Sequence, residues 1–146
     1  MKRTPLKRKS RLRYRSTKTQ AREEEAKPER RLMVHEGGNR CWICNTTPTR
    51  RKYPIRDLNN ICVHEIANGP HRLKALDKRH STLILCWNCN QNVVTGWKET
   101  RQLALLMSVR PEWYDLAAHN NLVNPNAPRR IEQHEVDAEL PTIWQR

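Results

Sequence analysis

The chain has 146 residues, with 28 Lys or Arg against 15 Asp or Glu, so its formal net charge at neutral pH is +13. This length suits one domain with tails, and a hydrophobic content of 36% predicts a small core that a cross-link or metal ion helps to hold. No stretch approaches the roughly 20 apolar residues that span a bilayer, and no hydrophobic signal region precedes the domain, so we expect an intracellular protein of the cytoplasm or nucleoid without membrane contact.

The N-terminal segment, residues 1–20, is expected to be a disordered basic arm. The first 22 residues contain ten Lys or Arg and no acidic residue, and they hold too little apolar surface to offset the entropy of ordering. Such an arm contacts nucleic-acid phosphates without reading sequence; a solubilising tail or a localisation signal is the alternative. The residues expected to contact phosphates are Lys2, Arg3, Lys7, Arg8, Lys9, Arg11, Arg13 and Arg15.

The first regular element expected is a helix over residues 21–35. Pro28 suits the first position of a helix, so a second helical segment that begins there would divide this helix in two. The pair Gly37 and Gly38 ends the helix, because glycine adopts the left-handed conformation that a helix stop requires.

Two short strands are expected next, over residues 61–66 and 81–85, with a turn at residues 68–70 between them. From Asn90 the apolar spacing of three and four predicts a helix that stops before Pro111, where a shorter helix starts.

The C-terminal segment, residues 121–146, contains three prolines and scattered acidic residues, so we expect an extended tail there. The folded domain is accordingly expected over residues 21–120.

Four of the five cysteines form two Cys-x-x-Cys pairs, Cys41 with Cys44 and Cys86 with Cys89. Two thiolates three positions apart on a tight turn can face one ion, and two such turns complete a tetrahedral zinc site. Four protein ligands leave no position for water, so this zinc is expected to be structural. Cys62 has no partner in this pattern and is expected to be a small buried residue.

The order of these elements, with Val63–Pro70 followed by Leu83–Asn90, resembles the core of HNH nucleases. The similarity is greatest to the phage recombination endonuclease VII-like members, and it covers about residues 41–98. It implies an α+β fold: a small ββα-metal core (also called the His-Me finger) with a four-cysteine zinc site and flanking helices.

The resemblance implies roles for two side chains. His64 takes the position of the general base that removes a proton from the attacking water. Asn90 takes the position of a ligand to a catalytic magnesium or manganese ion, for which an amide oxygen is suitable. A helix N-cap is the alternative role for Asn90.

Two positions depart from the family pattern. Val63 stands where an acid or histidine usually precedes the catalytic histidine, and Ser81 stands where an orienting asparagine is usual, with His80 beside it. Ser81 or His80 is expected to do the orienting, and His80 is the preferred second ligand of the catalytic ion, ahead of Glu65 and Asp57. Glu65 is expected to face away from the helix because neighbours on a strand point to opposite faces.

The activity that the resemblance implies is hydrolysis of phosphodiester bonds in duplex or branched DNA, as in phage DNA recombination and processing, which places a phage-encoded protein in the host cytoplasm. A homodimer is left open. Four basic residues are expected to bind the flanking phosphates: Arg72, Lys74, Lys78 and Arg79. The alternative is that these side chains only form a solvated surface.

Two other functions are compatible with the sequence. The first is a non-catalytic zinc-finger protein that binds nucleic acid through a degenerate HNH site. The second is a structural or adaptor protein of a phage particle that uses its five tryptophans at interfaces.

Overall fold

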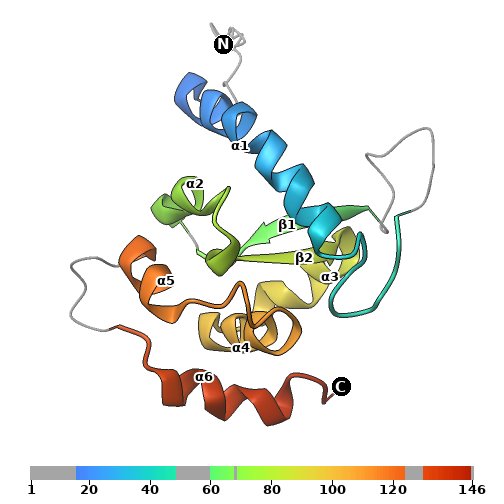
Figure 1. Cartoon of the computed structure of the whole chain (residues 1–146), viewed down its shortest axis with the longest axis vertical. Coiled ribbons are helices and arrows are strands. Elements are labelled where there is room, and N and C mark those ends of the chain that lie inside the picture. Colours follow the sequence, from blue (N-terminus) through green and yellow to red (C-terminus); the bar gives the residue numbers. More distant parts are fainter. Residues whose placement is uncertain (1–15, 49–59, 68, 124–129, 146) are drawn as a thin grey trace, which may run out of the picture.

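The computed structural model describes residues 16–48, 60–67, 69–123 and 130–145. Its helices and strands show that the chain is of the α+β type (Figure 1). None of the described helices is both long enough and apolar enough to span a membrane. The elements in chain order are α1 (Thr17–Glu36), β1 (Ile61–Glu65), η2 (Gly69–His71), α2 (Arg72–Ala75), η3 (Arg79–Ser81), β2 (Thr82–Cys86), α3 (Trp87–Asn92), η4 (Val94–Gly96), α4 (Glu99–Val109), α5 (Leu116–Val123), α6 (Gln133–Glu139) and η5 (Leu140–Thr142).

The two strands form an antiparallel pair, and α3 follows β2 without a break. Val63 lies opposite Ile84 in the register, so β1 and β2 overlap over all five of their residues. Every residue of β2 is buried, whereas β1 alternates over its last three positions, with Val63 and Glu65 buried and His64 half-buried. The two expected strands are confirmed to within one residue at each end.

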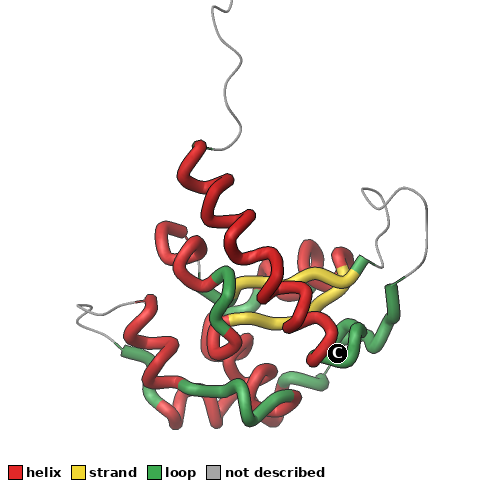
Figure 2. The backbone as a smooth tube through the Cα atoms, turned by 45° about the horizontal axis from the view of Figure 1, so that its top comes forward, coloured by secondary structure: helices red, strands yellow, loops and turns green. Residues whose placement is uncertain are grey.

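The strands lie between helices on both sides (Figure 2). Helix α1 packs against β1, α4 packs against β2 on the other side, and α6 covers the outer side of α4 (Figure 1). The core between these layers includes Met33 of α1, Leu83 and Leu85 of β2, Leu106 of α4 and Val136 of α6, all of them fully buried.

Helix α1 begins earlier than expected and is continuous through Pro28. The Ser16 hydroxyl accepts a hydrogen bond from the backbone N–H of Thr19 at 3.1 Å and so caps the helix. The expected arm boundary at residue 20 and the expected break at Pro28 are therefore wrong. Residues 1–15, which hold most of the arm, lie outside the described part of the chain.

The helical region after β2 begins earlier than expected and is interrupted. The N-cap of α3 is Cys86, whose sulfur accepts from the backbone N–H of Cys89, so Asn90 is an interior residue of α3 and not its N-cap. The chain then leaves the α-helix at Val93 and passes through η4 before α4 starts at Glu99. The expectation of one helix from Asn90 to Pro111 is wrong because Gly96 and the extended Trp97 separate two helices.

The C-terminal segment is folded over residues 133–142, so the expected extended tail is wrong there. Its apolar residues Val136, Leu140 and Ile143 recur at helical spacing and pack against the core. A capping box between Glu132 and Glu135 starts α6. Helix α5 also crosses the expected domain boundary at residue 120.

The end of α1 gives a test of the packing between α1 and β2. A Cβ atom at Gly37 would lie 2.8 Å from Ile84 Cγ1 and 3.0 Å from the Met33 carbonyl oxygen. We expect Gly37→Ala to lower the free energy of unfolding by about 2 kcal/mol, because the core must shift to admit the methyl group. Gly96→Ala is the matched control, since a Cβ there meets nothing within 4 Å. Urea unfolding measures both, and equal stabilities of the two variants would contradict the prediction.

Candidate metal centre and candidate active site

The four cysteines of the two Cys-x-x-Cys pairs lie together, with all their sulfur atoms within 4.8 Å of one another. Cys41 and Cys44 come from the turn after α1, and Cys86 and Cys89 come from the junction of β2 and α3. Among the described residues, no other group of three or more His, Cys, Asp or Glu side chains lies close enough to share a metal ion.

Backbone hydrogen bonds shape the first of these turns. The N–H of Cys41 donates to the Thr46 carbonyl and the N–H of Asn45 donates to the Cys41 carbonyl, each at 2.9 Å. Asn45 has φ +61°, a left-handed conformation that asparagine tolerates better than most residues. The N–H of Trp42 donates to the Ile84 carbonyl at 3.0 Å, which fixes the turn against the outer edge of β2.

The donor set fits a tetrahedral metal ion. Zinc–sulfur bonds of about 2.3 Å place the sulfurs of a tetrahedron about 3.8 Å apart, and Cys44 Sγ lies 3.6 Å from Cys86 Sγ. Burial raises the pKa of the Cys86 and Cys89 thiols. Burial also acts to raise the pKa of Cys44, but hydrogen bonding to Thr46 outweighs it and lowers that pKa to about 6. A cation bound between the four cysteines would stabilise their thiolates, since the cysteines themselves supply no positive charge.

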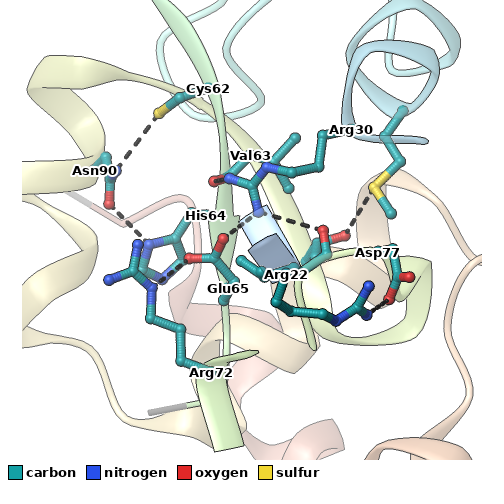
Figure 3. A network of polar contacts seen from close by, with 12 residues as sticks. Arg22, Arg30, Cys62, Val63, His64, Glu65, Arg72, Asp77 and Asn90 are labelled. Carbon is teal, nitrogen blue, oxygen red and sulfur yellow. Dashed lines mark hydrogen bonds and ion pairs between the residues drawn. The ribbon is translucent and has the colours of Figure 1, made fainter. Parts of the chain in front are cut away.

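The second site joins three elements around His64, which projects from β1. Its Nδ1 lies 2.8 Å from Asn90 Oδ1 of α3, and its Nε2 lies 2.9 Å from Gln102 Oε1 of α4 (Figure 3 shows the His64–Asn90 contact). His64 and Asn90, the two residues to which the resemblance gives roles, are thus in contact. The resemblance gave no role to Gln102, which is buried in the apolar stripe of α4. A glutamine at a buried position of a helix was the sequence signal that could have found it.

The hydrogen bonds determine which nitrogen of a neutral His64 carries the proton. Gln102 Nε2 donates to the Trp97 carbonyl at 3.2 Å, so the oxygen of the amide is the atom turned toward the imidazole. His64 Nε2 therefore donates to Gln102, and Nδ1 keeps its lone pair. An unprotonated Nδ1 is what a general base requires.

Asn90 sits opposite that lone pair. Its Nδ2 contacts Cys62 Sγ at 3.5 Å, which leaves Oδ1 facing His64 Nδ1, so two acceptors meet when the ring is neutral. A proton on Nδ1, a cation beside Asn90 or a rotated amide removes this conflict. Cys62 is half-buried, and its thiol donates to the Leu85 carbonyl at 3.4 Å.

Glu65 faces away from His64, as strand alternation predicts. Its carboxylate pairs with Arg30 of α1 and, at 3.1 Å, with Nε of Arg72 (Figure 3). The side chain of Glu65 is only 6% exposed, and both its oxygens are used in these pairs. Glu65 therefore joins α1, β1 and α2 and does not supply a ligand near His64. Asp57 lies outside the described residues.

Ser81 and His80 do not take the roles expected of them. The Ser81 hydroxyl lies 2.7 Å from Nδ1 of His119, whose Nε2 lies 2.7 Å from Glu99 Oε1. Ser81 and His119 are both fully buried, so this chain of contacts braces η3, α5 and α4 and is closed to substrate. Burial lowers the pKa of His80, and no contact joins His80 to Asn90 within the described part of the chain. Gln102, not Ser81 or His80, orients His64.

The four basic residues expected to bind phosphate divide into two kinds. Arg79 is engaged inside the protein, since it pairs with Glu29 and Glu36 and stacks over the Trp113 ring, and Lys78 lies 3.5 Å from Asp77. Lys74 is exposed, and the Arg72 side chain is 58% exposed although its Nε is held by Glu65. The eight basic residues between Lys2 and Arg15 lie outside the described residues.

No protein-family model, curated protein or solved structure matches the chain. The function must therefore be argued from the geometry of the two sites.

Loss of the metal is expected to unfold the domain, because structural zinc contributes about 10–16 kcal/mol of apparent binding free energy in small zinc peptides. Cys44→Ser should reduce bound zinc below one equivalent and lower the melting temperature, whereas Cys62→Ser should keep one equivalent. Elemental analysis and circular dichroism give the two readouts. Equal zinc contents in the two variants would exclude Cys44 as a ligand.

Proposed function

We propose that the chain is a metal-dependent DNA endonuclease of the HNH type, which hydrolyses phosphodiester bonds during DNA processing. The observation that carries this proposal is the position of His64. The side chain leaves the first strand of a hairpin, its Nε2 is held by Gln102, and its Nδ1 faces Asn90 on the helix that follows the hairpin. The imidazole is thus placed between the two helices that follow the hairpin.

The four-cysteine site supports the proposal as a structural zinc centre. Its sulfur-only donor set selects a soft or borderline ion such as zinc, and four protein ligands exclude water. Zinc would fix the start of α3, and Asn90 follows the ligand Cys89 directly in the chain. The zinc centre thus sets where Asn90 meets His64 without taking part in the reaction.

The proposed chemistry uses Nδ1 of His64 as the general base that accepts a proton from the attacking water. Asn90 Oδ1 would hold a magnesium or manganese ion, with phosphate oxygens and water as further ligands. Such an ion stabilises the negative charge that develops on the phosphate and on the leaving oxygen.

We assign Arg72 to a phosphate of the substrate because its side chain is 58% exposed. Glu65, the residue after His64, holds Arg72 at Nε and leaves the two terminal nitrogens of the guanidinium available. A guanidinium fixed at one nitrogen loses less entropy when its fork binds a phosphate. Lys74, which is exposed on the same short helix, can add to the charge.

A second candidate function is nucleic-acid binding without catalysis. Val63 is buried on the α1 side of β1 and offers no ligand, and Asn90 is the residue whose oxygen faces Nδ1 of His64. A degenerate site of this kind would keep its zinc cysteines and its basic surface while it lost its activity.

Plasmid nicking by the zinc-loaded protein tests the two functions. With magnesium or manganese present, we expect nicking that falls by about 100-fold or more in His64→Ala, the usual effect of losing a general base. His134→Ala is the matched control, since His134 is 76% exposed and pairs only with Glu132. Circular dichroism checks the folding of both variants. DNA binding with no nicking by the wild-type protein would favour the second candidate.

Gln102→Glu tests the orientation of His64 separately. A carboxylate beside Nε2 favours the protonated imidazole, so the acidic limb of the pH–rate profile should move to higher pH by about one unit. Gln102→Met, which removes the contact but keeps the volume, should lower the rate without such a shift. A change in stability alone, with an unmoved pH profile, would show that Gln102 has only a structural role.

A further inference from the structure

A cavity of about 500 Å³ lies beside the metal centre, apart from the surface of His64 that faces Asn90. Its lining includes two of the cysteines, two tryptophans and two polar residues: Cys44, Cys89, Trp97, Arg101, Trp144 and Gln145. Its volume lies within the range of sites that hold small organic groups, about 300–1,000 Å³.

The wall formed by Trp97 and Arg101 is rigid and has an unused donor. The Arg101 guanidinium lies 4.5 Å from the centre of the Trp97 ring and donates to the Thr142 carbonyl at 2.9 Å. Within the described part of the chain, Arg101 Nε is buried and has no hydrogen-bond partner. The guanidinium of Arg101 thus supplies a positive charge in the lining of the cavity.

Trp144 supplies the second aromatic ring of this cavity. It is 56% exposed, the largest exposed fraction among the described large hydrophobic side chains. An indole at the mouth of a cavity offers a face for stacking, and the side-chain amide of Gln145 beside it carries both a donor and an acceptor. Aromatic faces, arginine and amides together are the groups that hold an unpaired nucleic-acid base.

The cavity is also linked to His64. Trp97 forms its wall through the side chain and accepts a hydrogen bond from Gln102 through its carbonyl, and Gln102 in turn orients His64. A group bound against Trp97 is therefore separated from the imidazole by one side chain.

We propose that this cavity binds an unpaired nucleotide of a DNA substrate, with its base against Trp144. The choice of DNA as the ligand rests on the proposed function. The inference makes that function more specific, because the preferred substrate then carries single-stranded nucleotides near the bond that is cut, as branched DNA does. The net charge of +13 supplies the long-range attraction for such a strand.

Direct binding measurements test the proposal without any cleavage. The probes are a fluorescein-labelled 12-nucleotide oligothymidine and a labelled 12-base-pair duplex, with zinc-loaded protein and no magnesium or manganese. We expect Trp144→Ala to raise the Kd for the single strand at least fivefold, since a stacked base contributes about 1–3 kcal/mol, and to change the Kd for the duplex less than twofold. Trp144→Phe should retain most of the single-strand affinity.

Trp87→Ala is the matched control, because Trp87 is 49% exposed and lies outside the cavity lining. It should change neither Kd by more than twofold. Equal losses in the Trp87 and Trp144 variants, or equal losses for the two probes in Trp144→Ala, would overturn the proposal. Photo-crosslinking of an oligothymidine with one 5-iodouracil gives a second readout on the wild-type chain, with the adduct expected on Trp144 or Trp97. Because no cleavage is measured, a protein inactive in nicking can still pass this test, and an active nuclease can still fail it.

Discussion

The convergence of four thiols holds this structure together. A two-stranded hairpin alone is marginal in water, and this one has five residues in each strand. The cysteine turns attach the segment after α1 to the end of β2 and the start of α3, and the Trp42 N–H pairs with the free edge of β2 at Ile84. A metal ion held at this point would replace the cohesion that a larger apolar core supplies.

Strand β1 carries side chains with different contacts on its two faces. Alternation along β1 places Glu65 on the α1 side, where it neutralises Arg30 and Arg72, and places His64 on the side of α3 and α4. The buried ion pairs of Glu65 fix the position of β1 against α1, so His64 projects from a backbone that is held on both faces. The position of His64 therefore depends on a charge network on the opposite face of the strand.

Part of the positive charge is paired within the protein. Arg79 pairs with Glu29 and Glu36 and lies over the Trp113 ring. Arg30 pairs with Glu65 and donates a hydrogen bond to the Val63 carbonyl. Arg30 and Arg79 therefore tie α1 to β1 and η3. Other basic side chains, such as Lys74 and Lys98, remain exposed.

The sequence by itself predicted the features that depend on spacing within one segment. The Cys-x-x-Cys turns, the two strands, the glycine stop of α1 and the opposite directions of His64 and Glu65 all follow from local geometry. It did not reveal Gln102 as the partner of His64, the contact of Ser81 with His119, or the packing of α6 on α4, and it missed the break between α3 and α4. The contacts were decided by tertiary structure, because a long-range partner depends on how separate elements pack and is not specified by the pattern within one segment.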